Sequence, residues 1–541
     1  MIENMLSSPK RAPITLLAAI VLAILHQYLF FEKTPGISYP LFVILFYGFM
    51  LSFAKDRLRA KTYMDLFFAG SILLLSLTLV LFDNPLFRIL NVMAVPGLVS
   101  LHMAYLLGRK KRNWWEPGLI GTALDHLLPQ SIRHWKTLVL MASKTGGKGK
   151  GINRTQKAIV LKILAGLAIS FPILIIVLSL LSSADGIFSQ LVSGIPQWLD
   201  QLSFGEGFPR IVWVVVASLL FFGYVWGFVQ PMTYEAEKRE NAHWKNGMKV
   251  YGPMPLETGT ETDPAGDAAT KKAVAGQFYG AQSTNPQPVK LDPLIMGTIL
   301  VVINSVYVLF VFVQFAYLFG AGEGNLPSGM TYAEYARSGF AELVLVTGIN
   351  FVILTIALQF TNTVGSVGTR VHQVLLFITV GCSAIMLYSA FARLLLYEQA
   401  YGYTYIRFLV HAFMIFLAFL LLIASLRIVR TTFPMWRWVL ALSLTAYVAV
   451  NYVGMDRIIA ERNIERYHQS GDVDASYLAG LSADAVPLLS DFARKENEEL
   501  KALLLERRQQ LEADGSVHSW PSFNIAKYRA LHELQTLAAE E

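Results

Sequence analysis

Long apolar runs, separated by polar segments, occupy the first 455 or so residues of the chain. A run of about 20 mostly apolar residues crosses the hydrocarbon core of a bilayer as a helix, because backbone polar groups in lipid must bond within their own segment. The pattern therefore predicts an all-α, polytopic membrane protein with about eleven transmembrane helices. The predicted spans are 14–31, 40–54, 64–82, 87–107, 158–181, 211–229, 293–319, 341–360, 374–396, 404–426 and 435–453.

The composition supports this class. Charged residues make up 15% of the chain and the mean hydropathy is +0.46, whereas soluble proteins average about 25% charged residues. The single cysteine, Cys382, lies inside an apolar run, which excludes a disulfide framework and a thiolate metal cluster. We expect no metal site and no cofactor. The net charge of +7 arises mostly from loop residues, so it indicates membrane topology and not a nucleic-acid partner.

Basic residues are concentrated in alternate loops. They follow the second span at 55–61, the fourth at 109–112 and the sixth at 238–249. The connecting loops on the opposite side hold only Lys33, Arg88, Arg210 and Arg337. Since loops rich in Lys and Arg stay in the cytoplasm, the N-terminus is predicted to be cytoplasmic. Eleven spans then place the C-terminus outside the cytoplasm.

The loops divide the chain into four parts. Residues 1–230 are predicted to form a first bundle of six helices, and 291–455 a second bundle of five. Between them, 231–290 is rich in Gly, Pro and Thr and is predicted to be a cytoplasmic, disordered linker. Residues 456–541 are predicted to form a small helical extracytoplasmic tail.

A cytoplasmic insert at 108–157 carries apolar residues at helical spacing. They are Leu124, Leu127, Leu128, Ile132, Trp135 and Leu138. This spacing, after a basic run, is typical of an amphipathic element on anionic lipid. Ordinary anchoring next to a membrane span explains the same pattern.

One external loop contains a polar and aromatic cluster just before the eighth span. Its candidate binding residues are Tyr332, Glu334, Tyr335, Arg337 and Glu342. Thr331 with Glu334 fits a capping box, so a helix is predicted to begin here and enter the membrane. On that helix the cluster could bind a polar ligand or a lipid headgroup. The alternative is structural: tyrosines of the interfacial belt, a capping glutamate and an ion pair.

The tail contributes a second group of candidates. Tyr477, Ser482 and Asp484 lie in the segment Tyr-Leu-x-x-Leu-Ser-x-Asp-Ala-Val-Pro at 477–487, where Ser482 is a plausible helix N-cap. Residues 463–467 are predicted to continue the last span, and 490–513 to form one charged helix. Such a tail could cover the outer end of the membrane body.

Three segments of the sequence carry a resemblance to a known family. The segment Tyr-Ala-Glu-Tyr-Ala-Arg-x-Gly-Phe-x-Glu-Leu at 332–343, the 477–487 segment and Phe-Asn-x-x-Lys-Tyr-Arg-Ala at 523–530 resemble a family of bacterial multipass membrane proteins of unknown function. The resemblance covers roughly 155–530. It implies a bacterial plasma-membrane protein with no assigned reaction and transfers no catalytic residue.

Polar residues inside the predicted spans are few. Asn304 and Asn350, near the middle of spans seven and eight, are interpreted as an interhelical hydrogen-bonded pair more readily than as a substrate site. Arg393 and His411 lie in the outer half of their spans, and ionisable groups are expected to cluster there. Nothing charged is predicted at the midplane, which weakens a coupled transporter.

Three functions remain open. The favoured one is a non-enzymatic envelope sensor, scaffold or accessory protein that binds a ligand, lipid or partner protein at its outer face. The second is a membrane-embedded enzyme acting on lipid-linked sugar or a lipid headgroup, although the first external loop has no paired carboxylates. The third is a transporter. The metalloprotease and serine-hydrolase motifs His-Glu-x-x-His and Gly-x-Ser-x-Gly are both missing from the sequence.

Overall fold

The computed structural model describes residues 11–60, 62–109, 112–135, 207–230, 291–320, 340–361, 366–513 and 519–539. The chain forms two compact units. The first consists of 1–81, 89–233 and 514–524, and the second of 82–88, 234–513 and 525–541. The short segment 82–88 therefore belongs with the second unit, although the chain on both sides of it belongs to the first.

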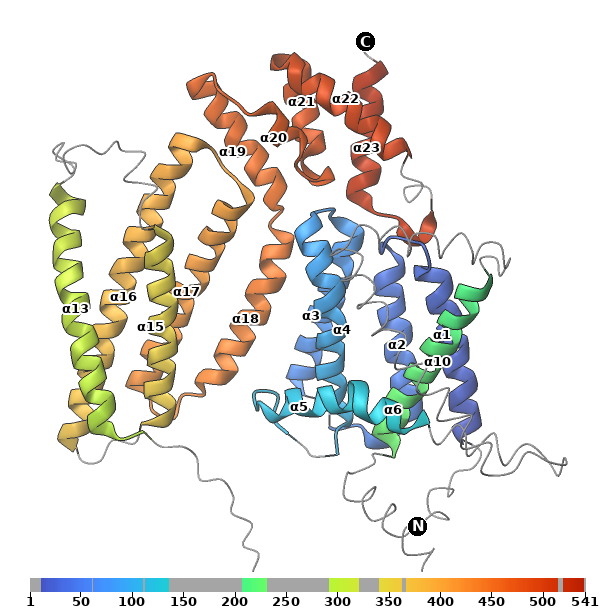
Figure 1. Ribbon diagram of the computed structural model, residues 1–541, viewed down its shortest axis with the longest axis horizontal. Helices are drawn as coiled ribbons and strands as arrows, with labels where there is room; N and C mark the ends of the chain where they lie inside the picture. Colours follow the sequence, from blue (N-terminus) through green and yellow to red (C-terminus); the bar gives the residue numbers. More distant parts are fainter. Residues whose placement is uncertain are drawn as a thin grey trace, which may run out of the picture. The chain divides into compact units, whose positions relative to one another are not determined.

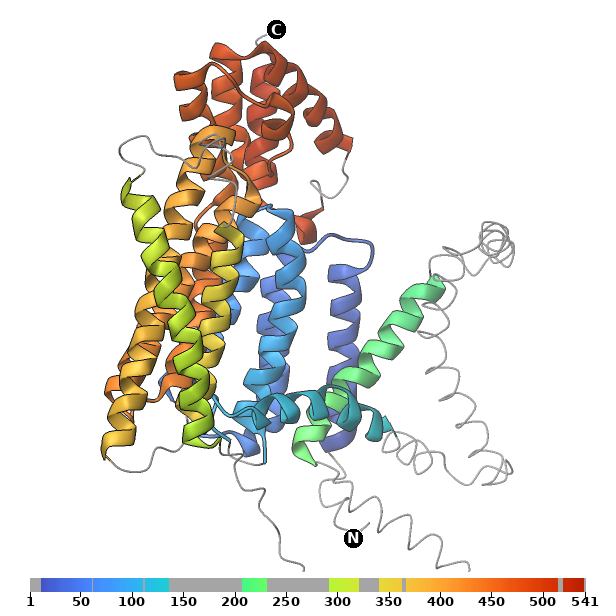
Figure 2. The ribbon, with the colours of Figure 1, turned by 60° about the vertical axis from the view of Figure 1, so that its left-hand side comes forward.

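The first unit is built from apolar helices that stand side by side (Figure 1). They are α1 (Arg11–Phe30), α2 (Ser38–Ala54), α3 (Tyr63–Leu81), α4 (Pro85–Leu107) and α10 (Gly207–Val229). Shorter elements are η2 (Lys55–Arg57), α5 (Gly118–Asp125), the π-helical η3 (His126–Gln130), α6 (Ser131–Arg133) and η7 (Trp520–Ser522). Figure 2 shows α5 and α6 running across the ends of the longer helices.

The second unit has its own set of long helices (Figure 1). They are α13 (Pro293–Gly320), α15 (Phe340–Phe360), α16 (Ser366–Tyr401), α17 (Tyr405–Val429) and α18 (Met435–Tyr452). With 36 residues, α16 is about 54 Å long at about 1.5 Å per residue, whereas the hydrocarbon core is about 30 Å thick. Its ends therefore extend past the predicted span 374–396.

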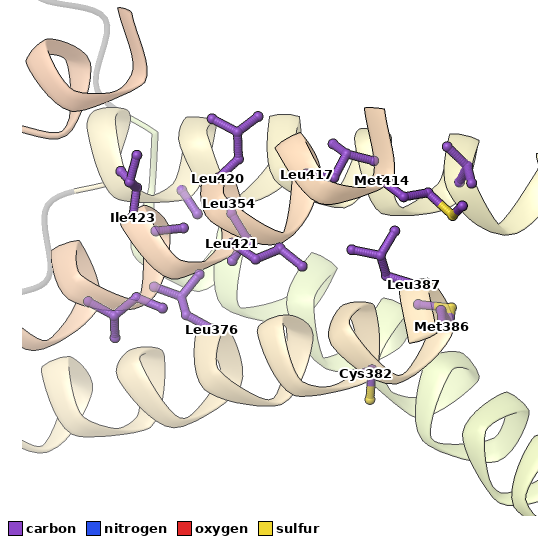
Figure 3. Packing of buried hydrophobic residues seen from close by; sticks show 14 of the residues in the cluster. Leu354, Leu376, Cys382, Met386, Leu387, Met414, Leu417, Leu420, Leu421 and Ile423 are labelled. Atoms are coloured by element: carbon purple, nitrogen blue, oxygen red, sulfur yellow. The ribbon is translucent and has the colours of Figure 1, made fainter. Parts of the chain in front are cut away.

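Helices α15, α16 and α17 pack through branched and flexible apolar side chains (Figure 3). Leu354, Leu376 and Leu421 from the three helices are each at most 4% exposed, and they belong to one continuous cluster. Cys382 lies buried in the same cluster. Close packing of this kind holds helices together in lipid, where neighbouring tails are as apolar as the side chains.

The chain bends where the last apolar helix ends. Gly454 has a left-handed φ of +72°, a conformation that glycine adopts without steric cost. Helices α18 and α19 (Met455–Ser470) meet there at 57°. The prediction that 463–467 continues the last span is therefore wrong, since the polar sequence after Gly454 leaves the direction of α18.

Short helices follow α19. They are α20 (Ala475–Ala479), η5 (Ala483–Ala485), α21 (Val486–Glu496), α22 (Glu498–Ala513) and α23 (Ile525–Ala539). The predicted single helix at 490–513 is wrong, because the chain breaks at Asn497, whose Oδ1 accepts a 2.7 Å hydrogen bond from the Leu500 amide and caps α22. These helices enclose a second core that includes Leu489, Leu500 and Leu534, each fully buried.

Among the described residues, nine helices are long and apolar enough to cross a membrane, or up to ten if α18 and α19 form one bent span. The predicted fold class, an all-α polytopic membrane protein, is confirmed. The predicted span 158–181 and the linker 231–290 lie outside the described residues.

Candidate functional site: a buried aspartate cluster

The first turn of α19 carries a carboxylate that three other segments bind. Asp456 is 1% exposed. Its oxygens accept hydrogen bonds from Asn84 Nδ2 at 2.6 Å, from the Ser482 amide at 2.9 Å and from the Tyr405 hydroxyl. The N-terminal turn of a helix favours a negative charge. Loop 82–88, the start of α17 and the start of η5 are thereby attached to α19.

Both polar atoms of the Asn84 side chain make hydrogen bonds. Its Oδ1 accepts a 3.1 Å hydrogen bond from the Phe87 amide, which caps the start of α4. Its Nδ2 reaches Asp456. One asparagine therefore both caps a helix start and binds the carboxylate of Asp456, within the second unit.

A second carboxylate lies beside the first. Asp484 Oδ2 accepts hydrogen bonds from the Asp83 amide at 2.9 Å and from Ser482 Oγ at 3.0 Å. Ser482 is the N-cap residue of η5, as its position in the sequence predicted, but its hydroxyl makes no cap bond and donates to Asp484 instead. Asp83, Asp456 and Asp484, with Ser482 and Tyr405, are called the aspartate cluster below.

Burial dominates the electrostatics of this cluster. It raises the pKa of Asp484 to about 6, with the nearby Asp456 and Asp83 charges adding to the rise and the two hydrogen bonds opposing it. The pKa of Asp83 is also raised by burial, against the opposing charges of Arg88, Lys527 and Arg507. Arg88 Nη1 lies 3.2 Å from Asp83 Oδ1.

Arg507 supplies a buried positive charge from α22. Its Nη1 donates hydrogen bonds to the carbonyl oxygens of Ala479, at 2.8 Å, and of Leu481. Burial lowers its pKa, while the nearby charges of Asp83 and Asp456 raise it. The guanidinium thus fastens the chain before η5 and partly balances the carboxylates.

The turn between α16 and α17 is held by the same tail helices. Asn463 of α19 accepts a 3.0 Å hydrogen bond from the Tyr403 amide and donates one of 2.9 Å to the Tyr403 carbonyl. The Tyr477 hydroxyl accepts from the Tyr405 amide at 3.2 Å. Gly402, at φ +78°, allows this approach, since a Cβ there would lie 2.6 Å from Asn463 Oδ1. Tyr477 is therefore a tail contact.

A different pair of ionisable side chains lies close to this turn. Glu398, near the end of α16, is 1% exposed, and its Oε1 lies 3.2 Å from His411 Nδ1 on α17. Within the described part of the chain, neither Glu398 oxygen has a hydrogen-bond partner. Arg393, one of the sequence candidates, is also buried on α16. Glu398 was missed by the sequence analysis, because its position at the edge of a span is typical of a solvated carboxylate.

The intramembrane asparagines do not bind each other. Asn304 donates to the Leu375 carbonyl and accepts from Thr379 Oγ1, both at 2.8 Å. Asn350 donates to Ser383 Oγ at 2.8 Å and accepts from the Tyr307 hydroxyl. The predicted mutual pair is therefore wrong, since both asparagines attach their helices to α16.

The first unit contains a polar group that the sequence analysis also missed. His102, 2% exposed, has Nδ1 2.7 Å from the Tyr47 hydroxyl and Nε2 3.9 Å from Asp65 Oδ1. Asp65 begins α3 and His102 lies near the end of α4, at the ends opposite to those joined by residues 82–84. In the predicted orientation these ends lie on the cytoplasmic side, so this pair departs from the expectation that ionisable groups cluster in the outer half.

The remaining sequence candidates belong to the loop before the eighth predicted span and to the start of that span. Tyr332, Glu334, Tyr335 and Arg337 lie outside the described residues. Glu342, in the first turn of α15, is exposed. Among the described residues, no group of three or more His, Cys, Asp or Glu side chains is arranged to hold a metal ion.

The chain was compared with known proteins. A family model described as a domain of unknown function (DUF4153) matches residues 69–492. The matched range contains Asp83, Asp456 and Asp484, whereas Arg507 and Lys527 lie beyond it. No curated protein and no solved structure matches the chain.

Proposed function

The chain belongs to the DUF4153 family, and we propose that it is a non-enzymatic sensor, scaffold or accessory protein of the bacterial cell envelope. Its helices α19–α23 form the binding part, on the extracytoplasmic side of the plasma membrane, and their partner is an envelope protein or a lipid. The observation that carries this proposal is the engagement of Asp456 by Asn84, Tyr405 and Ser482. It makes the tail helices a fixed extension of the second unit.

Three carboxylates of the tail are occupied by structural bonds, which favours binding over catalysis at these positions. Asp456 accepts three hydrogen bonds and Asp484 two. Asp474 caps α20 by accepting from the Tyr477 amide at 2.8 Å. A catalytic carboxylate needs room for substrate within hydrogen-bonding reach, and these oxygens are directed to partners within the chain.

The proposal is tested by photo-crosslinking in living cells. A photoreactive residue is placed at Glu499 or Tyr528, both exposed on the tail helices, with Lys55 as an exposed control on the predicted cytoplasmic side. We expect a discrete protein or lipid adduct at a tail position, lost in an Asp456→Ala background at equal abundance. Adducts that are equal at Lys55, or none at the tail, would contradict the proposal.

The orientation of the chain in the membrane is tested separately. Glu499→Cys in a Cys382→Ala background should react with a membrane-impermeant maleimide in intact spheroplasts, and Lys55→Cys should react only after lysis. The opposite labelling pattern would reverse the orientation and move the binding surface to the cytoplasm.

A second candidate function rests on Asp484. Its raised pKa and its position beside Asp83 are features that enzymes use in acids and bases. An enzyme acting on lipid-linked sugar or a lipid headgroup would lose activity in Asp484→Asn at unchanged abundance. Mass spectrometry of envelope lipids from deletion, wild-type and Asp484→Asn cells separates the two functions. If the protein is a scaffold, Asp484→Asn cells keep the wild-type lipid profile.

A further inference from the structure

The segment α5–η3–α6 is turned with its polar side toward the protein. His126, Gln130, Ser131 and His134 are between 0% and 7% exposed. The His126 ring stacks on Phe228 of α10 with centroids 4.1 Å apart, and Ser131 Oγ donates to the His126 carbonyl at 2.9 Å. This face is satisfied by contacts within the first unit.

Glycines on α10 allow the close approach. A Cβ on Gly223 would lie 2.3 Å from the Ser131 carbonyl oxygen, and one on Gly227 would lie 3.1 Å from Gln130 Cβ. Gly223 and Gly227 stand four residues apart, on one side of the helix. Small residues at this spacing let helix backbones meet within a membrane. The orientation of α5–η3–α6 is thus set by backbone packing.

The opposite side of the segment is apolar and exposed. Its members are Ile120, Leu124, Leu127, Leu128 and Ile132, which are 40–59% exposed. Contact with water costs about 25 cal/mol for each Å² of apolar surface, so a helix lying in water turns its apolar side to the protein. The reversed arrangement is stable when the outer medium is itself apolar.

Positive charge accompanies this apolar face. Arg133 ends the segment, with its Nη1 3.8 Å from Asp125 Oδ1, and Arg112, shortly before Gly118, closes the run Arg-Lys-Lys-Arg at 109–112. An apolar face flanked by basic residues is the pattern of helices that lie at the boundary of headgroups and acyl chains of anionic lipid. The segment also runs across the ends of the long helices (Figure 2), the direction that a membrane surface would take.

We propose that α5–η3–α6 is an interfacial helix that binds the anionic surface of the bilayer in which the protein is embedded. Leu124 and Leu128 lie among the acyl chains, and Arg112 and Arg133 bind anionic headgroups. This site is independent of the tail, so its test does not depend on the function proposed above.

The full-length protein in lipid nanodiscs tests the position of the apolar face. An environment-sensitive fluorophore is attached to Leu124→Cys in a Cys382→Ala background, with Thr122→Cys, half-buried on the same helix, as control. We expect spin-labelled lipid to quench the fluorophore at 124 at least twofold more than at 122, and aqueous iodide to quench it weakly at 124.

Two results would overturn the proposal. Strong iodide quenching at 124 places the face in water. Protection at 124 from both quenchers places it against another segment of the chain or a second copy. Gel filtration of the labelled samples reports whether either variant has misfolded, and Leu128→Cys provides a second label position on the same face.

The charge preference is measured with the same label. At equal mole fraction, spin-labelled anionic lipid should quench position 124 about fivefold more than spin-labelled zwitterionic lipid, the preference that about one basic residue near the surface supplies. The double substitution Arg112→Gln and Arg133→Gln should bring the ratio close to one, whereas Lys495→Gln on α21 should leave it unchanged. Equal quenching by both lipids in the unsubstituted protein would refute the anionic preference.

Discussion

Asp456 and Glu398 are carboxylates of the second unit with the same burial, 1% exposed each, yet their surroundings differ. Asp456 accepts hydrogen bonds from three segments, whereas among the described residues neither oxygen of Glu398 has a hydrogen-bond partner, and His411 Nδ1 lies 3.2 Å from its Oε1. A buried charge is costly unless hydrogen bonds and charge pairs replace its hydration. Burial alone therefore does not identify a carboxylate that stabilises a fold.

The largest loss of stability is expected from substitution of Asp456. Asp456→Ala leaves Asn84 and Tyr405 without their buried acceptor and should lower the free energy of unfolding of the second unit by about 3–5 kcal/mol, as removal of one partner of a buried charge network does. Thermal unfolding in detergent and limited proteolysis of α19–α23 measure the loss. Asp456→Asn is the matched control: it keeps one acceptor oxygen and should cost less. Equal losses in the two variants would show that the charge, and not the bonding geometry, is what matters.

A smaller loss is expected at the α16–α17 turn. Asn463→Ala removes both side-chain bonds to the Tyr403 backbone. It should cost about 2–3 kcal/mol, because each of the two part-buried backbone groups left unpaired costs near the low end of about 1–3 kcal/mol. Hydrogen exchange at 402–405 should rise several-fold, while exchange in the α22–α23 core stays unchanged. Unchanged protection at 402–405 would mean that the turn is held without the tail.

A gain in stability, and not a loss, is expected from substitution at Glu398. Replacing Glu398 and His411 together by Met and Leu removes a poorly bonded charge pair and should stabilise the unit by about 1–2 kcal/mol, since well-packed apolar residues often outperform a buried ion pair. Thermal unfolding in detergent measures the change. Destabilisation would indicate that the pair contributes to the fold as Asp456 does. Leu421→Ala, in the neighbouring apolar core, is a control for packing loss.

The smallest effect is a pH dependence from Asp484. Its pKa in the folded protein is raised from 3.8 to about 6, so the folded state binds this proton more tightly than the unfolded state. Stability therefore falls as pH rises from about 4 to about 6, and acidification from pH 7 to 5 should stabilise the unit. Asp83, whose pKa is also raised, acts in the same direction.

Unfolding temperatures of the wild type and Asp484→Asn between pH 4.5 and 7.5 measure this dependence. The difference between the two proteins should be largest above pH 6 and shrink toward pH 4.5, because protonation makes the wild type resemble the variant. A constant difference across this range would mean that Asp484 has an ordinary pKa.

Local pattern predicted the long helices within a few residues. The predicted spans 211–229 and 341–360 correspond to α10 (Gly207–Val229) and α15 (Phe340–Phe360). The errors occur where packing decides the outcome. The bend at Gly454 and the break at Asn497 interrupt sequences that are helical in pattern.

The residues of the candidate sites also divide into those that the sequence identified and those that it did not. Tyr477, Ser482 and Asp484 were found from the sequence because their segment is distinctive, but Asp456, Asn84 and Glu398 were not. The bond between Asn84 and Asp456 joins residues 372 positions apart. A single sequence contains no signal for such a pair, since each member alone is typical of a helix end or a loop.

The sequence by itself determined that the chain crosses a membrane as helices and where those helices lie, because apolar length and backbone hydrogen bonding are local requirements. Only the tertiary structure decided which carboxylates are buried and which of these accept hydrogen bonds. That outcome depends on the segments that fold against each residue, and the free energy of a buried charge is set by those neighbours and not by its own identity. Asp456 and Glu398 differ for this reason alone.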